Sequence, residues 1–170
     1  MRSTIAINVA APARLVFELA RDVTRWPDLL PHYVSVRRIG TPALDGALVA
    51  MMVARRPVSA LLGLGIPVTW QARTWTEPET LRLRFVHVAG ATKGMDVTWR
   101  IEPAAGGCRV AITHDFQPAW PWFAMVVDRW FTRPIAGRTL ATFKALAEAI
   151  ADIPSVPDKS NASRQTNPSR

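Results

Sequence analysis

Two histidines carry the acid–base chemistry that this sequence could perform. His87 and His114 each alternate with apolar side chains in a short stretch of strand-like pattern. An imidazole exchanges protons near neutral pH, so either side chain could polarise a carbonyl group or take a proton in an aldol-type ring closure and dehydration. The alternative is a hydrogen-bonded histidine of the core, and the sequence leaves both interpretations open.

Aromatic side chains are the second unusual feature, with seven tryptophans against one tyrosine. Flat aromatic walls suit a flat or polycyclic ligand, although ordinary core filling is the alternative. The segment from Trp120 to Phe123 could instead form an exposed apolar lip that touches a membrane or a carrier protein. The side chains expected to contact a ligand are Trp70, Arg73, Phe85, Met95, Trp99, Phe116, Trp122, Phe123 and Trp130.

The charged residues give weaker evidence for chemistry. Arg73 could pair with a ligand carboxylate or hold an enolate, since charge-assisted bonds are strong in a dry site, and Arg55 and Arg56 are lesser candidates for that role. Asp96 and Asp115 fall on the opposite side of their strands from the apolar residues, which predicts a solvated outer face.

Several kinds of active site are not indicated by any motif. The sequence has no glycine-rich phosphate loop, no His-Glu-x-x-His pair and no Gly-x-Ser-x-Gly elbow. Three histidines and one cysteine argue against a metal site, so we expect no metal and no cofactor. The remaining possibilities are chemistry inside a cavity, or binding alone.

Composition limits the class of protein. A chain of 170 residues with 49% hydrophobic content can bury one sizeable core, and we expect one domain over residues 1–153. The single cysteine, Cys108, fits a reducing compartment, and the absence of a signal peptide pattern or a membrane span predicts a cytoplasmic protein. The net charge of +8 favours an anionic partner such as an acyl carrier protein or a membrane surface. The arginines are scattered, so nucleic acid is not expected.

Hydrophobic periodicity predicts the elements that would position these residues. An alternating strand over 4–9 is followed by a helix over 12–21 and a short helical segment between Asp22 and Leu30. Six further strands are predicted, antiparallel because their connections are short, with Gly106-Gly107 making the clearest hairpin. They span residues 33–39, 47–56, 67–76, 80–88, 95–102 and 108–116.

The last predicted element is a long helix that begins near Gln117 and carries an apolar stripe as far as Ile150. Pro134 and Gly137 should kink it or divide it in two. Residues 154–170 lack the apolar side chains that would offset the entropy of ordering them, so we expect a disordered tail.

This order of elements resembles the helix-grip fold of the START-like, or SRPBCC, superfamily that includes pollen allergens. Within it, the sequence looks most like the polyketide cyclase/dehydrase and coenzyme Q-binding branch, over about residues 3–152. The segments that carry the likeness are 11–17 (APARLVF), 22–27 (DVTRWP), 94–101 (GMDVTWRI) and 137–140 (GRTL).

The resemblance implies an α+β architecture, in which a seven-stranded antiparallel sheet wraps around a long C-terminal helix and encloses a hydrophobic cavity. It implies a hydrophobic ligand, aromatic, polyketide-like or lipidic, and possible roles of two kinds. One is cyclisation and dehydration of a polyketide with acid–base help from His87 or His114. The other is a non-catalytic carrier of a lipid or quinone. Fold alone does not decide between them.

Overall fold

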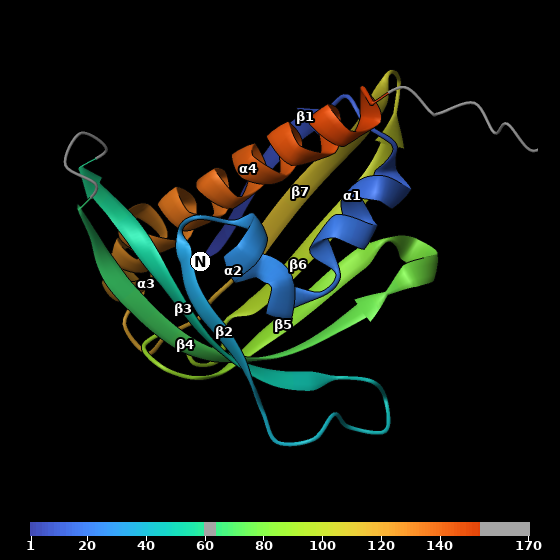
Figure 1. Ribbon diagram of the computed structural model, residues 1–170. Coiled ribbons are helices and arrows are strands. Elements are labelled where there is room, and N and C mark those ends of the chain that lie inside the picture. The colour runs from blue at the N-terminus through green and yellow to red at the C-terminus, as the bar shows by residue number, and fades with distance from the viewer. Residues whose placement is uncertain (60–63, 154–170) are drawn as a thin grey trace, which may run out of the picture.

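The computed structural model describes residues 1–59 and 64–153, so the tail expected at 154–170 lies outside the described residues. Figure 1 shows one curved sheet with helices on its concave side. The strands are β1 (Arg2–Val9), β2 (Tyr33–Ile39), β3 (Leu48–Ser59), β4 (Leu64–Glu77), β5 (Arg82–Ala89), β6 (Asp96–Ala104) and β7 (Gly107–Asp115). The helices are α1 (Ala13–Ala20), η1 (Val23–Arg25), α2 (Trp26–Leu29), η2 (Pro78–Thr80), α3 (Pro121–Val127), η3 (Asp128–Thr132) and α4 (Arg133–Ala151).

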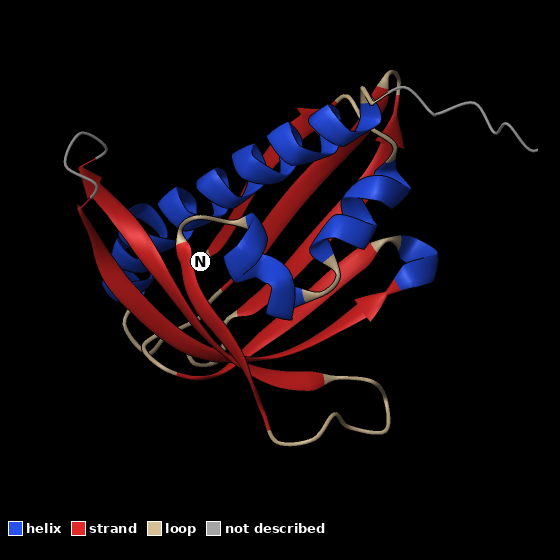
Figure 2. Ribbon diagram, viewed as in Figure 1, coloured by secondary structure: helices blue, strands red, loops and turns tan. Residues whose placement is uncertain are grey.

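The seven strands form one antiparallel sheet in the order β1-β7-β6-β5-β4-β3-β2. Consecutive strands from β2 to β7 are therefore neighbours, while β1 closes the sheet against β7. The sheet curves around α4, which crosses its concave face, and α1 and α2 lie beside α4 (Figures 1 and 2). This arrangement confirms the predicted helix-grip architecture.

Local sequence explains where the short elements begin and turn. The Oδ1 atom of Asp22 accepts a hydrogen bond from the backbone N–H of Thr24 at 3.0 Å and so caps η1. The predicted β6–β7 hairpin is also confirmed: Ala104 pairs with Gly107 across a two-residue turn. Gly106 and Gly107 both have positive φ angles, of +74° and +151°, which favour glycine.

An aromatic cluster fills the space between the sheet and the helices. Trp26 of α2 lies 5.4 Å from Trp99 of β6 and 6.0 Å from Phe143 of α4, measured between ring centroids. Trp99 and Phe143 meet edge-to-face at 5.8 Å. These side chains are all almost fully buried. The cluster therefore ties α2 and α4 to the sheet.

The long C-terminal helix is irregular just before Pro134, as predicted, but not at Gly137. Helical structure begins at Pro121 and changes to a π-helix, η3, before α4 starts at Arg133. The backbone stays helical from η3 into α4, where Arg133 N–H donates to the carbonyl of Asp128, five residues back. Pro134 has no N–H to donate and directly follows this wider turn. Gly137 lies inside α4 without interrupting it, so the expectation of a break at Gly137 was wrong.

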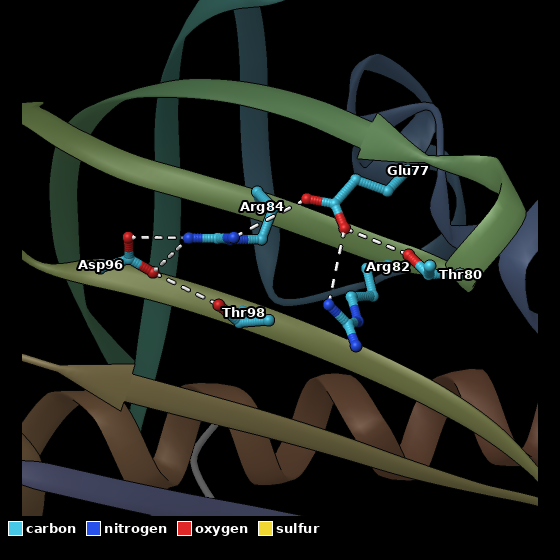
Figure 3. A network of polar contacts seen from close by, with 6 residues as sticks. All are labelled: Glu77, Thr80, Arg82, Arg84, Asp96 and Thr98. Atoms are coloured by element: carbon cyan, nitrogen blue, oxygen red, sulfur yellow. Dashed lines mark hydrogen bonds and ion pairs between the residues drawn. The ribbon is translucent and has the colours of Figure 1, made fainter.

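The outer face of the sheet is polar, as the strand alternation predicted. Arg84 of β5 contacts Asp96 of β6 at 3.2 Å and Glu77 of β4 at 3.7 Å, while Thr98 donates a hydrogen bond to Asp96 (Figure 3). Such partly exposed ion pairs contribute about 0–1 kcal/mol each. Their position confirms that Asp96 faces away from the interior.

Candidate functional site

A cavity of about 90 Å³ lies between the sheet and the C-terminal helical segments. Its sheet wall is mostly apolar and aromatic, and its helical wall comes from η3 and the first turns of α4. The sheet wall includes Met52, Val68, Trp70, Phe85, His87, Met95, Val97, Trp99, Ile112 and His114. The helical wall includes Phe131, Thr132, Ile135, Ala136 and Thr139, and Trp26, Tyr33 and Thr92 complete the lining.

The cavity brings both predicted histidines to one wall. His114 of β7 is paired in register with Val97 of β6, which is in turn paired with Phe85 of β5. His87 lies two residues beyond Phe85, and side chains two apart on a strand face the same side. His87 and His114 are therefore diagonal neighbours across β6, on the concave face.

The surroundings of His87 fix its ring. Its Nδ1 atom lies 2.6 Å from the hydroxyl of Thr92, and the ring stacks on Trp70 with centroids 5.9 Å apart. Burial, together with the nearby His114, lowers the pKa of His87 to about 4. The imidazole is therefore neutral at pH 7 and can accept a proton from a bound molecule.

His114 is more deeply buried, with only 7% of its surface exposed. Burial lowers the pKa of His114 to about 4, although the negative charge of Asp128 acts in the opposite direction. Both cavity histidines are therefore uncharged bases at neutral pH, in an environment where water competes weakly for their protons.

A second polar group, which no sequence pattern indicated, lies where α2, β2 and α4 meet. His32 Nε2 lies 2.8 Å from the hydroxyl of Thr139, which donates its own proton to the carbonyl of Ile135, so His32 is the donor of this pair. Burial lowers the pKa of His32 to about 4 and raises that of the adjacent Tyr33. Tyr33 and Thr139 line the cavity, whereas the imidazole of His32 lies behind its wall.

Four of the nine residues expected to contact a ligand line the cavity, namely Trp70, Phe85, Met95 and Trp99. Phe116 is buried next to the cavity wall, with its ring 6.3 Å from that of Phe123. Trp122 and Trp130 are about half exposed on α3 and η3. Phe116, Trp122, Phe123 and Trp130 all follow β7 in the chain, and none of the four lines the cavity.

Arg73 is placed away from the interior. Its guanidinium pairs with Asp45 and lies over the ring of Trp75, and 43% of the side chain is exposed. The sequence pattern left open whether Arg73 faces solvent or a ligand. The structure places it outside the cavity. Arg56 is also engaged elsewhere, since its guanidinium lies 4.7 Å from the ring centroid of Trp130.

A curved antiparallel sheet that holds a C-terminal helix above an apolar, histidine-bearing cavity defines a protein of the helix-grip class. The comparison with family models is specific: residues 1–148 match the family described as polyketide cyclase/dehydrase and lipid transport. The chain belongs to this family.

Curated relatives include two bifunctional enzymes of polyketide synthases. The chain is 28% identical over 150 residues to the granaticin polyketide synthase cyclase/dehydratase of Streptomyces virginiae, covering 84% of this chain and 46% of the relative. It is 28% identical over 149 residues to the actinorhodin polyketide synthase cyclase/dehydratase of Streptomyces coelicolor, covering 84% of this chain and 42% of the relative. The chain thus spans less than half the length of both.

Solved structures share the fold. The Zhui aromatase/cyclase from Streptomyces sp. R1128 superposes with a TM-score of 0.70 at 20% identity, over 87% of this chain and 93% of that one. A START superfamily protein from Mycobacterium smegmatis gives a TM-score of 0.57 at 15% identity, over 88% and 96% of the two chains. Within the described ranges, no helix is both long and apolar enough to cross a membrane.

Proposed function

We propose that this protein binds a polyketide-like aromatic precursor in its cavity and promotes ring closure followed by dehydration. The observation that carries the proposal is the placing of two neutral histidines, His87 and His114, on the wall of a cavity that is otherwise apolar and aromatic. Relatives named as cyclase/dehydratases support the same reaction class.

The chemistry requires only proton transfer and positioning. One imidazole takes a proton from the carbon between two carbonyl groups, and the resulting enolate attacks a second carbonyl of the same chain to close the ring. The imidazolium then returns the proton to the new alkoxide. Loss of that hydroxyl together with a neighbouring hydrogen releases one water and leaves a double bond. Holding the two reacting carbons together supplies much of the rate enhancement.

The size of the cavity adds a requirement to this proposal. Small-molecule sites usually enclose roughly 300–1,000 Å³, well above the 90 Å³ observed. A polyketide chain therefore needs the wall to move apart on binding. The helical wall is the part suited to this, because η3 is a π-helix and the flanking α3 exposes most of its side chains.

Substitution of each histidine tests the catalytic part. His87→Gln or His114→Gln should lower turnover of a synthetic poly-β-carbonyl thioester by about 100- to 10,000-fold. Binding of the same compound, followed by the fluorescence of the cavity tryptophans, should change little. His32→Gln is the matched control, since it removes a buried histidine that does not line the cavity. Wild-type turnover in both cavity variants would exclude the proposed roles.

A second candidate function is transport of a lipid or quinone without catalysis, and one observation favours it. Trp120 and Trp122 of the expected apolar lip are exposed, and the exposed apolar surface extends along the chain to Met125 of α3 and Trp130 of η3. Each of these four residues, called the apolar lip below, is 51–67% exposed. An aromatic surface of this kind suits a membrane or a carrier protein. Binding of a lipid or quinone by wild-type protein that shows no turnover of the thioester would support this function over the first.

A further inference from the structure

Three buried polar atoms beside the cavity lack hydrogen-bond partners among the residues described. They are Ser3 Oγ on β1, His114 Nδ1 on β7 and Asp128 Oδ1 on η3. Ser3 and His114 are direct partners in the β1–β7 register and are only 4% and 7% exposed. Side chains directly opposite each other on neighbouring strands have Cβ atoms about 4.5–5.5 Å apart. The serine hydroxyl and the imidazole are therefore adjacent.

Asp128 reaches the same place from the helical wall. Phe123 lies five residues before Asp128 and packs against Phe116, which is two residues beyond His114. Thr132 lies four residues after Asp128 and lines the cavity together with His114. Asp128 lies between these two contacts. Its Oδ2 atom accepts a hydrogen bond from Nε of Arg133 at 2.8 Å, and its side chain is only 15% exposed. The Arg133 contact uses one carboxylate oxygen and leaves Oδ1 buried.

These three atoms are chemically complementary. A buried carboxylate oxygen requires a donor, and an imidazole nitrogen can supply one only when it carries the proton. A serine hydroxyl can donate to one neighbour and accept from another. Leaving all three unpaired would cost about 1–3 kcal/mol for each group. A single water makes two to four hydrogen bonds and can join all three.

We propose that Asp128 and Ser3 are positioning residues that hold the proton of His114 on Nδ1. The Nε2 atom then keeps its lone pair and faces the cavity as the acceptor. A carboxylate that selects one tautomer of a histidine acts in this way in hydrolase triads. The role of Nε2 as a base toward a substrate rests on the proposed function. The tautomer of His114 does not, because it is a property of the free protein and is measured without substrate.

The experiment is nitrogen NMR of protein labelled with ¹⁵N in its imidazole rings. The chain has three histidines, so His32→Gln and His87→Gln identify the resonances of His114 by elimination. At neutral pH, the wild-type His114 should carry its proton on Nδ1. A proton on Nε2 of the wild-type ring would overturn the proposal without any further variant.

Substitutions then assign the cause. Asp128→Asn should convert His114 mainly to the Nε2–H form, and Ser3→Ala should shift it part of the way. Two controls should leave the tautomer unchanged: Arg133→Gln, which keeps the carboxylate of Asp128, and Asp96→Asn, the same chemical change on the outer face.

An unchanged tautomer of His114 in Asp128→Asn would overturn the role of Asp128. A shift there without one in Ser3→Ala would overturn the role of Ser3. If the wild type and the variants show the expected tautomers but the wild type has no turnover, the proposed function alone is contradicted.

Discussion

Burial holds His32, His87 and His114 in the uncharged state, and stability should depend on pH for this reason. In the unfolded chain each ring binds a proton near pH 6.5, but in the folded protein only near pH 4. The unfolded state therefore binds more protons between these values. The free energy of unfolding should decrease as the pH is lowered from 6.5 towards 4.

Urea denaturation at several pH values between about 7 and about 5 measures this effect. His87→Gln and His114→Gln should each make the decrease less steep, because a glutamine cannot take up the proton. The lowered pKa of Glu148 affects stability only below its ordinary value of 4.5, so the carboxylate contribution falls in a lower range. An equally steep decrease in all of the histidine variants would show that other groups cause it.

The residues of the cavity were only partly predictable from sequence. Strand alternation correctly placed Phe85, Met95 and Trp99 on the concave face, because that pattern is local. His32 and Thr139 were missed because they are 107 residues apart, and only the closing of the sheet over α4 brings them together. Asp128 was missed for a related reason: its importance depends on its place opposite β7, which no helical periodicity shows.

At the scale of elements, the β6–β7 hairpin offers a direct test of backbone geometry. A Cβ atom on Gly107 would lie 2.1 Å from the carbonyl oxygen of Val9 and 2.9 Å from the nitrogen of Ala11, at a φ of +151°. Both neighbours are backbone at the end of β1, so neither can rotate away. Gly107→Ala should lower the free energy of unfolding by about 3 kcal/mol.

Gly106→Ala is the matched control for this substitution. Gly106 also has a positive φ, of +74°, but a Cβ there would meet nothing within 4 Å. The backbone strain alone should cost about 1–2 kcal/mol. Urea denaturation of the two variants measures the free energy of unfolding that each substitution removes. Equal decreases would show that the close contact with β1 does not explain the need for glycine at position 107.

The C-terminal helix shows where sequence patterns fail for elements. Pro134 correctly indicated an irregularity in the helix, since a proline inside a helix removes a hydrogen bond. The structure places Pro134 in the first turn of α4 and the irregularity before it, in η3. Leu81 is a similar case: its apolar character predicted a strand residue, but it has a left-handed φ of +49° after η2 and precedes β5. The position of the π-helical turn and the left-handed backbone of Leu81 both depend on contacts between distant segments, which a local sequence pattern does not reveal.

At the scale of the whole molecule, two features favour an anionic membrane surface as a partner, namely the net positive charge and the exposed apolar lip. The chain carries a net charge of +8, and the exposed apolar lip of α3 and η3 includes Arg129 between its aromatic residues. Tryptophan side chains favour the interface of a bilayer, and basic residues are attracted to anionic lipids. We therefore expect the protein to sediment with anionic vesicles at low salt, and much less with neutral ones.

The lip and the overall charge make separable contributions to that binding. Trp122→Ala removes about 1.5 kcal/mol of apolar burial and should lower the partition constant about tenfold. Leu44→Ala is the control, because Leu44 is a fully exposed apolar residue away from the lip. It lies in the loop before β3, whereas Arg56, which contacts Trp130 of the lip, lies near the other end of that strand. Added salt should weaken binding of both variants alike, since it screens only the charges. Equal binding by Trp122→Ala and wild type would overturn the role of the lip in membrane binding.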